Sequence, residues 1–200
     1  MSTLSDILIK HSDKQKIISF LSDHYKIGKK ISDSELQLLK YYKVDSEVKT
    51  FVIHKDKNDE WTQIEYELGE STESLKEFDN LILEFTEKFK TQAIIAYEQT
   101  TSGACRFTVF ENGKIVRSII QTYLYPDDKI RITENIGKKF NFETYKYATA
   151  INEEIDYEEL LSYYDDFQPW LKCLGFEWTR EYGTYKDYIH LEILQKKINT

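Results

Sequence analysis

The sequence predicts an α+β protein built on an antiparallel sheet of about five or six strands. Short runs of alternating apolar and polar residues are joined by tight reversals, as in antiparallel sheets. One strongly amphipathic helix is predicted among them, at residues 73–90. The composition, 40% hydrophobic and 31% charged, is typical of a folded globular chain. We expect residues 1–45 to be an N-terminal helical segment of the same domain, and residues 46–200 to form the α+β domain.

Two short helices, packed as a hairpin, are predicted in the first 45 residues. Ser12–Gln15 has the pattern of a capping box, in which two side chains satisfy free backbone N–H groups at a helix start. An apolar stripe follows, and Gly28 is expected to end this helix. The capping pattern recurs at Ser32–Glu35, before a second apolar stripe.

The middle of the chain predicts a hairpin, a helix and further strands. Residues 48–68 alternate on both sides of a polar turn, which predicts a β-hairpin. The helix at 73–90 is expected to lie across the sheet with its apolar face, which comprises Leu75, Phe78, Leu81, Ile82, Phe85 and Phe89. Strands are predicted over 92–124, where Asn112-Gly113 favours a type I′ turn because both positions need positive φ.

The last third predicts edge strands and short helices. Residues 129–133 and 185–195 are possible edge strands, because apolar side chains alternate in both. Asp156–Glu159 has a capping pattern that is expected to open one C-terminal helix, and residues 169–175 predict another.

Charge and cysteine content argue against several classes of protein. The net charge of −8 disfavours binding to a nucleic-acid backbone, which needs clustered Lys and Arg. No run approaches the ~18 apolar residues of a membrane span, and the N-terminus lacks the pattern of a secretion signal. Cys105 and Cys173 are isolated, without the spacing of a disulfide framework or a metal site. We therefore expect a cytoplasmic, bacterial-type protein without a membrane or nucleic-acid partner.

No catalytic residue, metal site or cofactor is predicted. Cys105 alternates with Phe107 and Val109, so we expect a small buried side chain instead of a nucleophile. The four histidines lack zinc-site spacing. The loop Thr100–Gly103 has hydroxyl groups but no glycine-rich phosphate cradle; it is expected to be exposed, and its role stays open.

Three functions compete, and a non-enzymatic interaction protein is favoured. It would cover a basic protein partner, as an antagonist or immunity-like protein does. The negative charge, the 15 tyrosines and an acidic stretch beside aromatic residues support it. The candidate contact residues are Tyr163, Tyr164, Asp165, Asp166 and Trp170.

The second candidate is a small-ligand-binding domain with an aromatic pocket between sheet and helix. Its candidate residues are Tyr97, Arg106 and Arg117. An ion pair between Glu98 and either arginine is the expected structural explanation for both cations. The third candidate is an enzyme with an unfamiliar site. The oligomeric state stays open.

Overall fold

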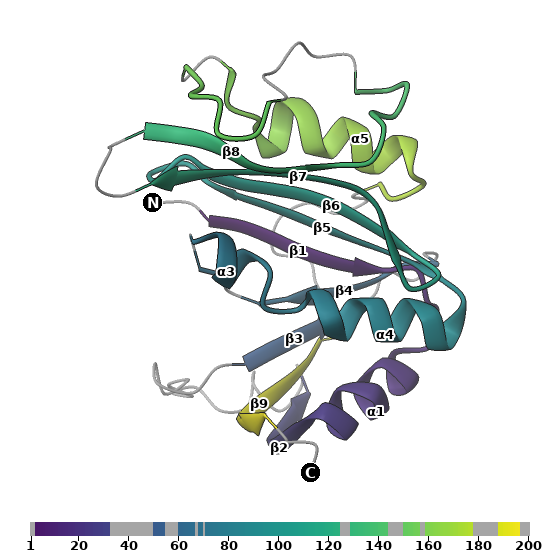
Figure 1. Ribbon diagram of the computed structural model, residues 1–200. Coiled ribbons are helices and arrows are strands. Elements are labelled where there is room, and N and C mark those ends of the chain that lie inside the picture. The colour runs from purple at the N-terminus through teal and green to yellow at the C-terminus, as the bar shows by residue number, and fades with distance from the viewer. Residues whose placement is uncertain are drawn as a thin grey trace. The chain divides into compact units, whose positions relative to one another are not determined.

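The computed structural model describes residues 3–32, 50–54, 60–66, 68–69, 71–124, 129–143, 150–156, 159–177 and 188–196. The chain folds into two compact units. The first unit comprises residues 1–7 and 67–177, and the second comprises residues 8–66 and 178–200. Each contains at least one helix and antiparallel strands, which confirms the α+β prediction (Figure 1). The strands outnumber the five or six that the sequence predicts.

The first unit is built on five neighbouring strands in the order β1-β5-β6-β7-β8. Their bounds are Thr3–Ile9 for β1 (the unit includes it up to Ile7), Gln92–Gln99 for β5, Ala104–Glu111 for β6, Lys114–Leu124 for β7 and Lys129–Ile136 for β8. Strands β5 to β8 pair antiparallel in chain order, which confirms the strands predicted at 92–124 and 129–133. Asn112 and Gly113 have φ of 49° and 79°, as a type I′ turn requires.

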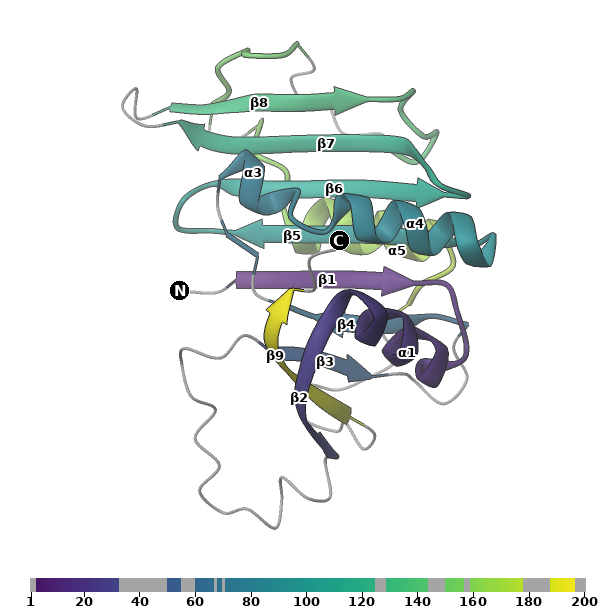
Figure 2. The ribbon, with the colours of Figure 1, turned by 60° about the horizontal axis from the view of Figure 1, so that its bottom comes forward.

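The helix predicted at 73–90 is interrupted in its first third. It consists of α3 (Thr72–Leu75) and α4 (Asp79–Phe89). Both lie on one face of the sheet, and α5 (Gln168–Cys173) lies on the opposite face (Figures 1 and 2). Most of the predicted apolar stripe is buried, namely Leu75, Phe78, Ile82 and Phe85. The amphipathic pattern therefore predicted the packing, although not the interruption.

The capping pattern predicted at Asp156–Glu159 is present, since Glu159 donates its N–H to the carbonyl of Asp156 at 2.9 Å and its Oε2 accepts the N–H of Asp156 at 3.3 Å. The longer C-terminal helices begin after it. A short π-helix, η2 (Tyr163–Phe167), starts after Ser162, whose Oγ accepts the N–H of Asp165. It continues directly into α5, which has a proline in its first turn. Across the described segments, no helix has the length and apolar character that crossing a membrane would require.

The second unit contains four neighbouring strands in the order β2-β9-β3-β4. Their bounds are Tyr25–Ser32 for β2, Tyr188–Lys196 for β9, Thr50–His54 for β3 and Thr62–Glu65 for β4. Strands β3 and β4 pair antiparallel and confirm the hairpin at 48–68. Strand β9 pairs with β2 on one side and β3 on the other, so the prediction of an edge strand at 185–195 is wrong. Its Leu191 is fully buried.

The predicted N-terminal helical hairpin is wrong in two of its parts. Residues 3–9 form β1 and residues 25–32 form β2; between them, α1 (Lys14–His24) is helical. The chain continues as a strand after His24 because β2 pairs with β9, which lies more than 150 residues later. Gly28 therefore lies within a strand and does not end the helix.

The first helix is capped by a different residue from the one predicted. The carboxylate of Asp13 accepts the N–H groups of Gln15 and Lys16, so Asp13 and not Ser12 is the N-cap. The second predicted helix, after Ser32, falls in residues 33–49, outside the described residues.

Candidate functional site

Strand β6 separates two kinds of core in the first unit. Side chains alternate along a strand, so Arg106 and Thr108 face one side while Cys105 and Phe107 face the other. Arg106 donates to Leu75 of α3 and to Asp79 of α4, whereas Phe107 packs against Phe167 of η2 and Trp170 of α5. Figure 2 shows α3 and α4 in front of the strands and α5 behind them. The two faces therefore have to be considered separately.

Arg106 is fully buried, and each of its guanidinium nitrogens donates to an acceptor. Nη2 donates to Asp79 Oδ1 at 2.6 Å, Nε donates to Thr108 Oγ1 at 2.8 Å, and Nη1 donates to the carbonyl of Leu75. Leu75 is the last residue of α3, where backbone carbonyls lack helical partners. The arginine therefore satisfies the backbone where the predicted helix is interrupted.

Burial acts against both charges of the Arg106–Asp79 pair. It lowers the pKa of Arg106 and raises the pKa of Asp79, although the attraction between the two groups works in the opposite direction for each. The pair is held by its hydrogen bonds within a desolvated core, which is the environment of a structural ion pair.

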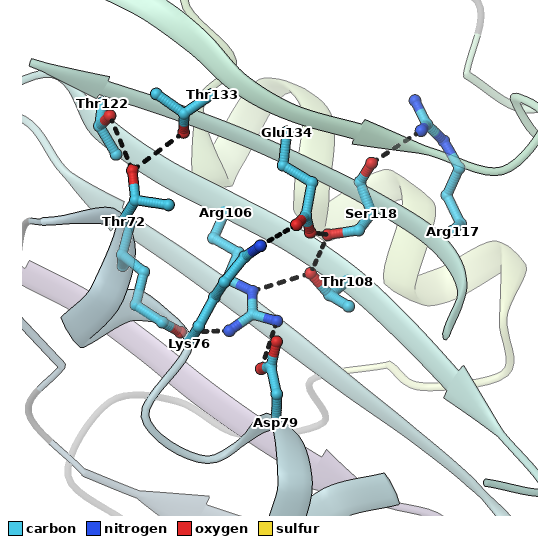
Figure 3. A network of polar contacts seen from close by, with 11 residues as sticks. Thr72, Lys76, Asp79, Arg106, Thr108, Arg117, Ser118, Thr122, Thr133 and Glu134 are labelled. Atoms are coloured by element: carbon cyan, nitrogen blue, oxygen red, sulfur yellow. Dashed lines mark hydrogen bonds and ion pairs between the residues drawn. The ribbon is translucent and has the colours of Figure 1, made fainter. Parts of the chain in front are cut away.

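The polar network continues across β6, β7 and β8 (Figure 3). The hydroxyl groups of Thr108 and Ser118 lie 2.7 Å apart, and Ser118 donates to Glu134 Oε1 at 2.5 Å. Glu134 also forms an ion pair with Lys76, which follows α3. The network thus joins two cations and two carboxylates, so its charges balance within the chain.

Arg117 lies on the opposite face from Arg106 and forms an ion pair with a different carboxylate, that of Glu143. Its Nε and Nη2 donate to both oxygens of Glu143, at 2.9 to 3.1 Å, and the two side chains are fully buried. Its Nη1 donates to Asn135 Oδ1 and to the carbonyl of Ile136, both at 2.8 Å. The Nη1 bonds fix the end of β8 to β7, and the bidentate pair fixes Glu143 beside them.

The three residues predicted to bind a ligand do not form one site. Tyr97 lies opposite Arg106 in the β5–β6 pair, whereas Arg117 lies on the other face. All three are fully buried, and the hydroxyl of Tyr97 donates to Gln99 Oε1 at 2.8 Å. Their polar groups serve internal contacts and do not face solvent.

The predicted ion pair of Glu98 with an arginine is wrong. Glu98 lies opposite Cys105, on the face that Arg106 does not share. Its Oε2 accepts the N–H of Tyr163 at 2.5 Å and so fixes the start of η2 to β5. The hydroxyl of Tyr163 donates to Asp6 on β1.

Cys105 is buried as predicted. Its Sγ donates to Gln121 Oε1 at 2.9 Å, and desolvation raises the pKa of the thiol far above its ordinary value. A thiol in this state stays protonated, which agrees with a packing role.

The five residues predicted to form an acidic-aromatic surface fall into two groups. Tyr163, Asp166 and Trp170 are buried, so they cannot contact a partner in this conformation. Tyr164 and Asp165 are exposed, with 62% of Tyr164 accessible to solvent. The alternation of burial follows from η2, which turns neighbouring residues toward and away from the sheet.

The loop Thr100–Gly103 connects β5 and β6. Thr100 and Thr101 are exposed, as expected, but Gly103 is buried with φ of 67°. A Cβ atom at Gly103 would lie 2.3 Å from Ile130 Cδ1, so the turn requires glycine both for its backbone and for its space. The glycine of this loop therefore has a structural explanation.

Charge is distributed unevenly between the two units. The first unit has 12 Lys and Arg against 22 Asp and Glu, a net charge of −10, whereas the second has 15 against 13, a net charge of +2. Residues 147–171 contain seven Asp and Glu and no Lys or Arg. Four of these acidic residues are exposed in the described part, namely Glu153, Glu154, Asp156 and Asp165.

Metal binding finds no support in the described ranges, where no group of three or more His, Cys, Asp or Glu side chains is arranged to hold an ion. No protein-family model matches the sequence, and no curated protein or solved structure matches it significantly.

Proposed function

We propose that this protein is a non-enzymatic interaction module whose acidic first unit binds and covers a basic protein partner. The uneven charge carries the proposal, since the first unit has a net charge of −10 while the second has +2. A folded unit with such an excess of one sign attracts oppositely charged surfaces and accelerates their association.

The buried groups of the first unit favour this proposal over the two alternatives. Arg106 and Arg117 are neutralised by carboxylates within the chain, and Cys105 is desolvated and protonated. These are the side chains that the ligand-binding and enzymatic alternatives would use. They support packing instead, which leaves the surface charge as the functional feature of this unit.

Salt-dependent capture tests the proposal. The purified protein is immobilised and incubated with lysate at low and at high ionic strength, and retained proteins are identified by mass spectrometry. We expect a partner of positive net charge that is retained at low salt and released at high salt, because screening weakens exposed charge pairs. An unrelated acidic protein of similar net charge serves as the control bait and removes general polycation binders.

The purified partner is then titrated by calorimetry. A dissociation constant that rises steeply with salt supports the proposal. The proposal is contradicted if every retained partner binds the control bait equally well. It is also contradicted if the affinity of the partner is independent of salt.

A further inference from the structure

We infer that the basic partner docks on one surface of the first unit, which we call the acidic segment, and that the partner presents lysine or arginine side chains next to apolar side chains. The acidic segment comprises the exposed residues Ile151, Glu153, Glu154, Asp156, Tyr164 and Asp165. This inference rests on the proposed function and names its contact surface.

The first part of the acidic segment is fixed along the outer edge of β8. Ile132 donates its N–H to the carbonyl of Glu153 at 3.3 Å, and Ile155 donates its N–H to the carbonyl of Ile130 at 3.1 Å. These bonds occupy the edge of the strand and hold the backbone that carries the exposed side chains in a defined position. A preorganised surface loses less conformational entropy when it binds.

The second part is fixed to the neighbouring strand by Gln121. Its Nε2 donates to the carbonyl of Glu159 at 3.3 Å, and its Oε1 accepts the N–H of Leu161 at 2.9 Å. Gln121 lies opposite Ile132 in the β7–β8 pair, so the anchors on β7 and β8 are on adjacent strands.

The third anchor is on β5, where Glu98 holds the N–H of Tyr163 at 2.5 Å. Strands β5 and β8 are separated by three strand spacings, roughly 14 Å at about 4.8 Å each. A surface of that width fits within the ~800 Å² that each partner contributes to a standard protein interface. The acidic segment thus has the size of one docking site.

Exposed apolar side chains distinguish this surface from an ordinary solvated acidic face. In the described part of the chain, the exposed large hydrophobic residues are Ile136, Ile151 and Tyr164. Two of the three belong to the acidic segment, with exposures of 51% for Ile151 and 62% for Tyr164. The ring of Tyr164 contacts that of Tyr163 edge-on at 5.7 Å, which restricts its orientation. Aromatic anchors with charges around them are typical of binding surfaces.

The outer face of α3 and α4 provides a comparison. It also exposes glutamates, at Glu73, Glu77, Glu84 and Glu87, but Lys88 and Lys90 lie among them. In the acidic segment, Lys129 from β8 pairs with Glu154 and Arg131 donates to the carbonyl of Asn152. The remaining carboxylates there have no cation within residues 147–171. Negative charge and exposed apolar groups thus coincide on the acidic segment.

The experiment is an NMR titration with defined peptide probes. The main probe is an amphipathic Leu/Lys peptide; an all-Lys peptide and a Leu/Glu peptide of equal length are the controls. We expect saturable shift changes in residues 150–167 with the Leu/Lys peptide, weaker changes with the all-Lys peptide and none with the Leu/Glu peptide. Changes centred on α4, or equal binding of the Leu/Lys and all-Lys peptides, would overturn the inference.

Matched variants sharpen the titration. The triple variant Glu153→Gln, Asp156→Asn, Asp165→Asn removes three charges but keeps acceptor oxygens, and we expect it to weaken Leu/Lys binding about tenfold. Tyr164→Ala is expected to weaken it by a similar factor. The control Glu77→Gln, Glu84→Gln, Glu87→Gln also removes three charges and is expected to change binding less than about threefold.

The two proposals fail separately. If the control triple weakens the Leu/Lys peptide as much as the acidic-segment triple does, the surface is wrong, and salt-dependent capture of a basic partner can still stand. If capture gives no salt-sensitive partner of positive charge, the proposed function itself is wrong, whatever the peptide titration shows.

Discussion

The two faces of the sheet in the first unit share the same strands but are stabilised by different interactions. On the face that carries α3 and α4, Arg106 joins a network of buried charges and hydroxyl groups. On the opposite face, Phe107 packs against Phe167 and Trp170, with ring centroids 5.4 Å and 5.1 Å apart. Alternation along β6 creates this division, since neighbouring residues point to opposite sides.

The difference shows how the unit separates its inner and outer charges. The carboxylates on the network face have internal cations, and the charges there balance. On the aromatic face, Glu98 binds a backbone N–H instead, and neighbouring acidic residues such as Asp165 point to solvent. The buried cation of the aromatic face, Arg117, is paired with Glu143, and the segment that covers this face provides the acidic surface.

The largest effect is expected from Arg106→Ala. Removing the guanidinium leaves the carbonyl of Leu75 and the largely buried carboxylate of Asp79 without their donor, which should lower the free energy of unfolding by about 4 kcal/mol. Urea denaturation followed by circular dichroism measures the change. Arg131→Ala, at a half-buried position on β8, is the control and should change it by less than about 1 kcal/mol. Equal losses for the two variants would contradict a special role for the network face.

A somewhat smaller loss is expected from Phe107→Ala on the other face. Its ring is fully buried between Phe167 and Trp170, so truncation leaves a cavity and should lower the free energy of unfolding by about 3 kcal/mol. Tyr164→Ala removes an exposed ring from the same side and should change stability by no more than about 0.5 kcal/mol. A stable Phe107→Ala variant would show that the aromatic cluster contributes little.

Asp166→Asn should alter the pH dependence of stability. Burial raises the folded-state pKa of Asp166 above its ordinary value of 3.8, so the folded chain binds this proton more tightly than the unfolded chain does. The group therefore lowers stability as pH rises from 3.8 through the folded pKa, and the effect is complete above it. The amide can still accept the N–H of Ser162, a bond that Asp166 makes at 2.9 Å.

The measurement is a series of urea unfolding curves between acidic and neutral pH. The stability of Asp166→Asn relative to the natural chain should increase with pH. Asp156→Asn removes a charge from an exposed position and is the control. A constant difference between Asp166→Asn and the natural chain would show that the buried carboxylate does not titrate in this way.

The smallest effect concerns the thiols and does not alter the fold. Cys105 is buried with a raised pKa, whereas Cys173 is exposed on α5. We expect a thiol reagent to modify Cys173 rapidly in the native protein and Cys105 only after denaturation. Peptide mapping by mass spectrometry identifies the modified residue. Rapid native labelling of Cys105 would mean that the aromatic face opens readily.

Local patterns predicted the parts of the fold that depend on near neighbours. The Asn112-Gly113 turn and the alternation around Cys105 are contained in a few consecutive residues, and the structure confirms both. The apolar stripe at 73–90 also predicted the packed face of a helix correctly. Its interruption could not be predicted, because it involves Arg106, which lies 31 residues after Leu75.

Long-range pairing decided the elements that were predicted wrongly. The sequence of β2 predicts the end of a helix, but its pairing with β9 makes it a strand. The sequence of β9 predicts an edge strand, but β9 pairs with β2 on one side and β3 on the other. Long-range packing also decided which candidate contact residues are exposed and which are buried. Tyr164 and Asp165 remain on the surface, while Trp170 is buried under a strand whose facing residue is far away in the sequence.

The sequence by itself determined the α+β class, the central hairpins, the buried state of Cys105 and the excess of acidic residues. Each depends on composition or on the period of side chains along a short stretch. The tertiary structure decided which carboxylate neutralises which arginine, and which unit carries the negative charge. Those outcomes depend on contacts between residues far apart in the chain, such as Glu143 with Arg117, and no local period encodes them.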